Sequence, residues 1–207
     1  MEAEEVVDAV EKVLDSPERK FVEGVDLCIN LMNVDLKQPK NRINLDIYLP
    51  KTFREPKIGV FASGEVALKA KEAGADVLDP EELKKMDKQK ARALVNKYDL
   101  FAADVTFMAL IGKSLGTVLG PRGKMPIPIP PGADPVQILS RLQRVVKVKS
   151  KTTTFWVNIG RKDMSAKDIA ENAVAVIKAV ESHLERGLQN IGSIYMKATM
   201  GPAVKVV

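Results

Sequence analysis

Strict alternation of apolar and polar residues occurs near both ends of this 207-residue chain, with a long stretch of different pattern between them. It runs through GVDLCINL (24–31) and INLDIYLP (43–50), and it returns in TFWVNIG (154–160) and SIYMKAT (193–199). Alternation of period two predicts strands with one buried face. Because two strands alone are marginally stable in water, we expect the strands of both ends to share one domain. Apolar residues at helical spacing predict a helix before Ser16 and another after Ser165.

The middle of the chain has a different pattern of apolar residues. KIGVFAS (57–63) is almost continuously apolar, as in a strand buried on both faces, and a helical stretch and GADVLDPEEL (74–83) follow it. We expect a second strand over Tyr98–Ala103, a helix through Met108 and Leu110, and another helix over Pro135–Val146. This alternation predicts a small doubly wound unit of about four strand–helix pairs.

Together these patterns predict an α/β chain with two domains. The first is an α+β domain built from both termini, residues 1–53 and 149–207. The second is an α/β domain inserted between them as residues 54–148. Two connections then cross between the domains, and such double crossings often behave as a hinge.

Composition excludes several classes of protein. The hydrophobic content of 45% is enough for one large core or two modest ones. The single cysteine, Cys28, excludes an intramolecular disulfide, and the acidic start MEAEEVVDAVEKVL does not resemble a signal peptide. No apolar run has the length of a membrane span. We therefore expect a soluble, cytoplasmic protein without a membrane partner.

The positive charge is concentrated in parts of the chain. Basic and acidic residues number 6 and 11 in 1–50, 18 and 11 in 51–150, and 8 and 5 in 151–207, for a net charge of +5. The densest basic groups are LKQPKNR (36–42), GKSLGTVLGPRGK (112–124) and RVVKVKSK (144–151). Uneven charge of this kind is typical of proteins that bind a polyanion, although solvated surface lysines are the alternative.

No motif assembles a reaction centre. A phosphate-binding loop ending in GKS needs a glycine where this chain has Phe107, and the turn after the first strand of the middle domain offers only Gly64. His183, the only histidine, lies near a predicted helix end, where a capping role is favoured, and Cys28 has no neighbouring base. No metal-ligand spacing occurs. We expect neither enzyme activity nor a cofactor or metal.

Two motifs combine glycine and proline with polar or basic residues. In LGPRGKMP, Gly120, Pro121 and Gly123 permit a turn or a close approach, and Arg122 and Lys124 could meet phosphates. A simple corner and an RNA contact remain alternatives there.

In KATMGP, a strand ends on Thr199, and Met200 and Gly201 follow it. The segment is either a strand stop with Met200 turned inward or a set that presents a hydroxyl, a soft apolar side chain and bare backbone. Such a set suits RNA, with its ribose hydroxyls and splayed bases.

LGPRGKMP and TMGP in this order resemble the ribosomal protein L-one (L1) family, the stalk protein of the large ribosomal subunit. The resemblance extends over the whole chain and includes KF at 20–21, GADVLDPEEL, KSLG before GPRG, and SIYMKATMGP. DLKQPKNRI (35–43) is similar to the archaeal version of the family. The resemblance implies a discontinuous first domain, an inserted Rossmann-like second domain and a hinge between them.

The resemblance also implies partners and contact residues. It implies binding to structured large-subunit ribosomal RNA through the first domain, a role in deacylated tRNA release, and repression of translation by binding the protein's own mRNA. We expect a monomer when the protein is free. Carried over by motif, the RNA-binding residues are Lys20, Phe21, Ser193, Thr199, Met200 and Gly201. Asp26 stands where bacterial relatives often have Glu, and we add Lys40 and Arg42 from charge and loop placement. Residues 120–124 are expected at a domain junction or an auxiliary RNA contact.

Three alternatives stay open from the sequence. Phe21 precedes a strand and could pack into the core instead of binding RNA. The glycine-rich middle domain could belong to an enzyme for a phosphorylated small molecule, with a pocket at the carboxyl ends of its strands. The protein could also be a structural scaffold that binds no RNA, in which case the basic groups would have no binding role.

Overall fold

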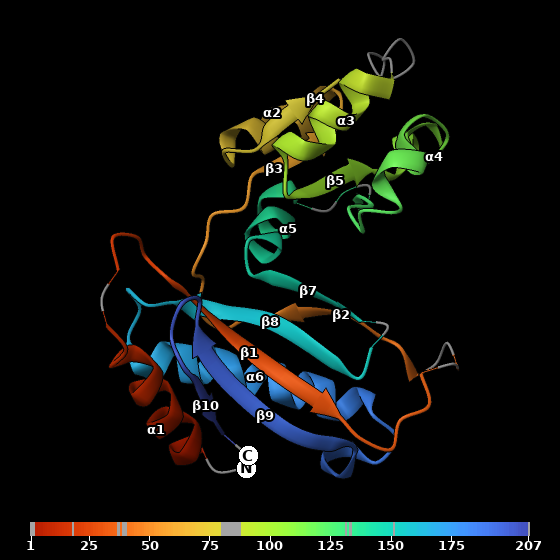
Figure 1. Cartoon of the computed structure of the whole chain (residues 1–207). Helices are drawn as coiled ribbons and strands as arrows, with labels where there is room; N and C mark the ends of the chain where they lie inside the picture. Colours follow the sequence, from red (N-terminus) through yellow and green to blue (C-terminus); the bar gives the residue numbers. More distant parts are fainter. Residues whose placement is uncertain are drawn as a thin grey trace. The chain divides into compact units, whose positions relative to one another are not determined.

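The computed structural model describes residues 3–17, 19–36, 38, 41–79, 88–130, 132, 134–150 and 152–206. The chain divides into two compact units, residues 1–53 with 144–207 and residues 54–143 (Figure 1). The fold is mixed α/β, as the sequence predicts. Lys40, one of the predicted RNA-binding residues, lies outside the described residues, and so do residues 80–83 at the end of GADVLDPEEL.

The first unit contains an antiparallel sheet with strand order β10-β9-β1-β8. Its strands are β1 (Gly24–Leu31), β8 (Thr154–Arg161), β9 (Ile191–Ala198) and β10 (Ala203–Lys205). A separate two-stranded ribbon pairs β2 (Ile43–Tyr48) with β7 (Val145–Ser150). The central pairs join strands from opposite ends of the sequence, as the alternation predicts.

Two helices cover one face of this sheet. They are α1 (Ala3–Leu14) and α6 (Ala166–His183); in Figure 1, α6 lies behind β1 and β9, and α1 lies to the left, beside β10. Val6, Val10 and Val13 of α1 are buried at helical spacing in the same core as Leu27 and Ile29 of β1. Ser165 caps α6, because its hydroxyl accepts a hydrogen bond from Asp168 N at 3.2 Å, which confirms the predicted helix start. The opposite face of the sheet has no helix over it within the described part of this unit.

The second unit is a parallel sheet between two pairs of helices. Its strand order is β4-β3-β5-β6, with β3 (Ile58–Phe61), β4 (Asp76–Leu78), β5 (Leu100–Asp104) and β6 (Ile127–Ile129). Residues of α2 (Gly64–Glu72) and α5 (Pro135–Leu142) share one core with Val60 and Ala102. Residues of α3 (Lys88–Lys97) and α4 (Val105–Leu119) share the other core with Phe61 and Phe101, whose rings stack 5.6 Å apart. The four predicted strand–helix pairs are confirmed.

The expected helix over Pro135–Val146 is too long. α5 ends at Leu142, and Val145 and Val146 instead form β7 with Ile47 and Tyr48 of β2. RVVKVK fits a helical and a strand pattern equally, and the long-range pairing with β2 selects the strand. As a result, residues 144–148, which the sequence pattern places in the insert, belong to the first unit.

A short turn follows the end of α6. The helix stops at His183, and Gly187 has φ 54° and begins a short 3-10 turn, Gly187–Asn190.

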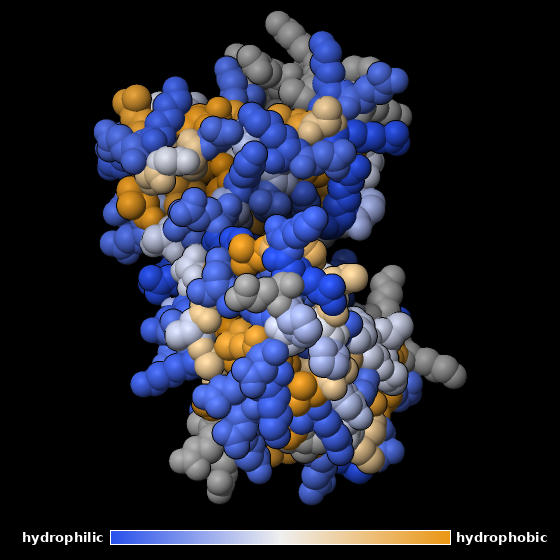
Figure 2. All heavy atoms as spheres, turned by 60° about the vertical axis from the view of Figure 1, so that its left-hand side comes forward, coloured by the Kyte–Doolittle hydropathy of each residue, from blue (hydrophilic) through white to orange (hydrophobic). Residues whose placement is uncertain are grey.

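On the face drawn in Figure 2, hydrophilic side chains surround interrupted hydrophobic patches. Across the described residues, no helix is long and apolar enough to span a membrane.

Candidate functional site

The uncovered face of the first unit's sheet carries polar side chains in register. Alternation puts Leu27 and Ile29 of β1 in the core and turns Asp26, Cys28 and Asn30 to the other face. On β8 and β9 the same alternation gives the uncovered face Thr154, Trp156 and Asn158, and Ser193, Tyr195 and Lys197. Three of the predicted RNA-binding residues, Asp26, Ser193 and Thr199, therefore lie on this face or at its edge.

Thr199 is held against the start of β1. Its Oγ1 donates a hydrogen bond to Gly24 O and accepts one from Gly24 N, both at 3.2 Å, and Thr199 N donates to the same carbonyl at 3.0 Å. A Cβ at Gly24 would lie 3.6 Å from Thr199 Oγ1, an ordinary contact, but only 2.8 Å from Asn158 Nδ2, so a side chain at Gly24 would displace the Asn158 amide. A hydroxyl has one donor and two acceptor positions, so one acceptor position of Thr199 remains for a ligand.

A tight turn after β9 presents Met200. Gly201 N donates to Ala198 O at 3.0 Å, and Met200 N donates to Glu23 Oε1 at 2.8 Å. The Met200 side chain is 61% exposed. A Cβ at Gly201 would lie 3.2 Å from Ala198 Cβ and 3.3 Å from Ser16 Oγ, which leaves little room for a side chain. The alternative of a methionine turned inward is wrong.

The buried carboxylate of Glu23 holds this turn in place. The Glu23 side chain is 1% exposed, and its Oε2 lies 3.7 Å from Lys162 Nζ. Lys162 Nζ also donates to the carbonyl and hydroxyl oxygens of Ser16, just after α1. Removal of one partner of a buried ion pair costs several kcal/mol, about 3–5, because the other charge loses its partner. Glu23 and Lys162 thus fix the position of Met200 relative to α1.

Two side-chain pairs arrange the polar groups on the sheet. Asn158 Nδ2 donates to Asp26 Oδ1 at 2.8 Å, and Asn30 Nδ2 donates to Ser193 Oγ at 2.8 Å. The second carboxylate oxygen of Asp26 can accept further hydrogen bonds, and the Ser193 hydroxyl keeps its proton to donate. The face therefore offers acceptors at Asp26 and Thr199 and a donor at Ser193.

The KF segment lies next to the Glu23 turn in sequence. Lys20 is exposed and Phe21 is 54% exposed, so Phe21 does not pack into the core. This result removes the structural alternative for Phe21 and leaves an aromatic ring available at the surface.

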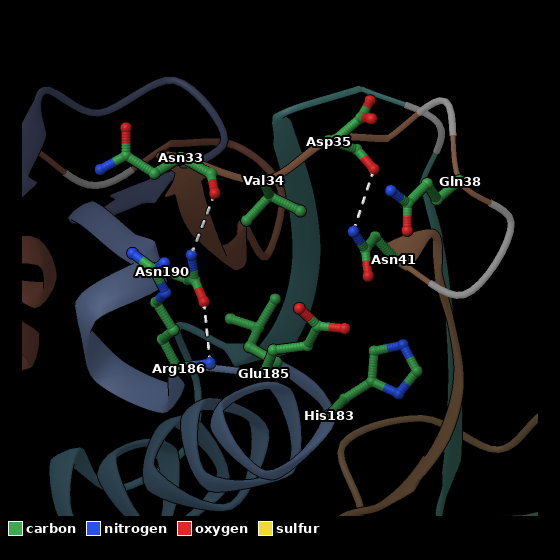
Figure 3. Close-up of a pocket in the computed structure, with 10 residues that line it drawn as sticks. Asn33, Val34, Asp35, Gln38, Asn41, His183, Glu185, Arg186 and Asn190 are labelled. Carbon is green, nitrogen blue, oxygen red and sulfur yellow. Dashed lines mark hydrogen bonds between the residues drawn. The ribbon is translucent and has the colours of Figure 1, made fainter.

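The basic loop before β2 lies beside a polar hollow of about 480 Å³ (Figure 3). Asn190 organises one wall: its Nδ2 donates to Asn33 O at 3.4 Å and its Oδ1 accepts from Arg186 N at 3.0 Å. The ring of His183 lies on the opposite side, with Nε2 3.4 Å from Arg42 O. Arg42 is exposed and its Nε donates to Leu36 O at 3.3 Å. Lys40 lies outside the described residues.

The GPRGK turn is tied to the end of α3 within the second unit. Lys124 Nζ donates to Val95 O at 3.1 Å and to Tyr98 O at 2.6 Å. Arg122 Nη1 donates to Asn96 Oδ1, and Gly123 has φ 66°. Cations at a helix C-terminus complement its dipole and its unpaired carbonyls. Gly120 N donates to Gly116 O at 2.9 Å, and Pro121 is exposed at the same turn. These contacts are those of a turn; an RNA contact by residues 120–124 stays a prediction.

The carboxyl ends of the parallel strands do not favour a phosphate pocket. A hollow of about 260 Å³ lies between the starts of α2 and α5, but Glu65 and Asp134 contribute carboxylates to its lining. Asp134 caps α5 by accepting from Val136 N at 3.2 Å, and Glu65 pairs with Lys69 at 2.8 Å. Negative charge at both helix starts opposes an anionic ligand. Among the described residues, no cluster of three or more acidic, histidine or cysteine side chains is arranged to hold a metal.

Sequence reasoning missed several residues of the site. Glu23, Lys162 and Asn158 are in no motif, and each acts on a residue far away in the sequence. Trp156 had a detectable signal, since a tryptophan on the polar side of an alternating strand predicts an exposed aromatic ring. It is 62% exposed.

Comparison with known sequences gives a consistent result. The sequence profile described as the ribosomal protein L1p/L10e family matches residues 11–202. Large ribosomal subunit protein uL1 of Methanocella arvoryzae is 51% identical over all of both chains. The proteins of the same name from Methanothrix thermoacetophila and Archaeoglobus fulgidus are 49% and 47% identical, over 99% or more of each chain.

Proposed function

The chain belongs to the ribosomal protein L1p/L10e family, and on that premise we propose that it binds a structured site in large-subunit ribosomal RNA through its first unit. It is an archaeal-type protein of the large ribosomal subunit, a structural component and not an enzyme. As a ribosomal protein it works in the cytoplasm.

The observation that carries the proposal is the set of unfilled hydrogen-bonding positions on one exposed surface. Asp26 and Thr199 each keep an acceptor, and Ser193 keeps a donor, because their other positions are filled by Asn158, Gly24 and Asn30. A ribose 2′-hydroxyl both donates and accepts, so it matches either kind of group and distinguishes RNA from DNA.

The exposed apolar groups complete the proposed interface. Phe21 and Met200 are both exposed. Glu23 lies two residues after Phe21 and accepts a hydrogen bond from Met200 N, so it connects the two segments. An aromatic ring and a flexible thioether can pack against sugars and unstacked bases of an RNA internal loop. Gly201 is needed within the turn itself, because a Cβ there would point at Ala198 and Ser16; contact of its backbone with RNA is part of the proposal.

Basic residues would supply the part of the affinity that depends on salt. Lys20 and Arg42 are exposed in the first unit, and Lys40 is proposed with them from the sequence. Each ammonium or guanidinium group that meets a phosphate releases a counterion, which lowers the binding constant as salt rises.

Two finer functions and an expectation about the free protein are part of the proposal. The same surface would bind a mimic of the ribosomal site in the protein's own mRNA and repress its translation. In the ribosome the protein would contact deacylated tRNA and take part in its release. The free protein is proposed to be a monomer, with the inserted unit joined to the RNA-binding unit by a hinge.

Hydroxyl-radical footprinting of large-subunit ribosomal RNA tests the main proposal. With the full chain present, we expect protection of one compact stem-and-internal-loop region. Replacement of Met200 by Ala should weaken protection there without moving it. Protection spread evenly along helical RNA would contradict a specific site.

A further inference from the structure

The uncovered sheet face carries an aromatic row that the proposed contacts do not use. Trp156 on β8 pairs with Cys28 on β1, Cys28 pairs with Tyr195 on β9, and Tyr195 pairs with Lys205 on β10. Side chains of directly paired residues lie next to each other on one face. The row therefore runs across all four strands in the order indole, thiol, phenol and ammonium.

The burial of this row is unequal. Trp156 is 62% exposed, whereas Cys28 is only 5% exposed although it points away from the core. Its two cross-strand neighbours, Trp156 and Tyr195, flank it on either side and account for its burial. The thiol of Cys28 thus lies buried between two aromatic side chains. Burial raises the pKa of Cys28, which keeps the thiol neutral. The exposed apolar surface of the row is therefore mainly the Trp156 ring, with the partly exposed Tyr195 on the other side of the buried thiol.

The position of the row connects it to the proposed RNA contacts. Asp26 lies two residues before Cys28 on β1, and Asn30, which holds Ser193, lies two residues after it. At about 3.3 Å of rise per residue, each of these flanking rows is about 7 Å from the aromatic row. An RNA strand that contacts both Asp26 and Ser193 must cross the aromatic row between them.

The surrounding charge suits a polyanion. Lys197 pairs with Asp26 on the uncovered face, and Lys205 pairs with Tyr195. Lys205 thus ends the row on β10 and Lys197 lies beside the row on β9, while Trp156 is at the β8 edge. Indole is the largest aromatic surface available to a protein, and its exposure in water is unfavourable unless something covers it.

We propose that Trp156 is a stacking platform for an unpaired nucleobase of the bound RNA, with Cys28 and Tyr195 as the rest of the apolar surface. The inference rests on the proposed RNA-binding function and adds to it a base contact at a residue that lies outside the motifs. The ligand group is a base without a Watson–Crick partner, because a paired base in a duplex has no free face to offer.

The single tryptophan of the chain makes the test direct. The full chain is titrated with a stem-and-internal-loop fragment of large-subunit RNA, and binding is followed both by anisotropy of labelled RNA and by Trp156 emission. Stacking predicts that emission is quenched in parallel with binding. Trp156→Leu should lower affinity about 5- to 150-fold, the equivalent of one lost base–aromatic stack, and Trp156→Phe should recover part of it.

Tyr48 provides the matched control. It is 61% exposed on β2, outside the four-stranded sheet, and Tyr48→Leu should leave RNA affinity unchanged. Thermal unfolding of each variant verifies that the fold is intact. Tight, specific RNA binding with unquenched emission and an unchanged affinity of Trp156→Leu would overturn the stacking platform and leave the proposed function standing. Absence of binding by the unaltered chain would overturn both.

Discussion

Thr199→Val is the substitution that isolates one hydroxyl of the proposed interface. Valine keeps the shape and the β-branch of threonine but has neither a donor nor an acceptor on its side chain. The Thr199 hydroxyl makes two hydrogen bonds to Gly24, both at 3.2 Å, and has one further acceptor position directed to no other described residue. The change therefore affects folding and RNA binding by separate amounts.

The expected cost to folding is modest. Each of the two hydrogen bonds contributes about 0.5–1 kcal/mol, since both are neutral and lie near solvent, so the free energy of unfolding should fall by about 1–2 kcal/mol. The Thr199 N–H bond to Gly24 O involves only backbone and remains, which keeps the turn closed.

The expected cost to RNA binding is larger. A ribose hydroxyl that loses its acceptor inside an interface costs about 1–3 kcal/mol, or about a 5- to 150-fold loss of affinity. Filter binding or calorimetry with the stem-and-internal-loop RNA measures this change at a temperature where both proteins are folded. Thr199→Ser, which restores the hydroxyl, should recover most of the affinity.

Thr117→Val is the matched control, because Thr117 is exposed on α4 of the second unit. It should change neither quantity beyond experimental error. An unaltered affinity of Thr199→Val, with an intact fold, would refute the assignment of the Thr199 hydroxyl to the RNA interface.

Three further substitutions separate binding from folding. Met200→Ala should lower RNA affinity about fivefold through lost apolar contact and leave the melting temperature unchanged, because the side chain is exposed; a large drop in melting temperature would show that it is structural. Lys124→Met should lower the stability of the second unit by about 1–3 kcal/mol, since two carbonyls at the end of α3 lose their donor, while RNA affinity stays constant in the same titration. The hydrogen bond from Ser165 and the ammonium of Lys51 hold the pKa of Asp168 below its ordinary value, so its stabilising effect is present above about pH 3.9 and is lost as pH falls through the lower folded-state pKa. Melting curves of Asp168→Asn should accordingly lie below those of the unaltered chain at pH 7 and approach them only as the pH falls below about 3.9 and through the folded-state pKa.

Local patterns were sufficient to predict most elements of the fold. Alternation in β1 and β8 identified both their existence and their buried faces, since period two reports directly which side meets the core. The prediction failed at Val145 and Val146, where a local pattern fits two structures and the partner strand decides. That partner, β2, is about 100 residues away in the sequence, beyond the reach of any local window.

The candidate site shows the same division. Thr199, Met200 and Gly201 are adjacent in the sequence, so a motif could reveal them. Glu23 acts on Met200 N from 177 positions away, and Asn158 acts on Asp26 from 132 positions away. Neither pairing leaves a local signature, because it arises only when the two ends of the chain come together in one sheet.

The most direct test of RNA recognition by the first unit compares two RNAs across a salt series. The full chain is titrated with the stem-and-internal-loop fragment of large-subunit RNA and with a plain duplex of equal length. Specific recognition predicts tighter binding to the structured fragment at every salt concentration, because contacts to ribose hydroxyls and unpaired bases do not depend on counterion release. Equal affinities that fall with the same steep slope would show that the basic residues attract any polyanion, and would contradict the account.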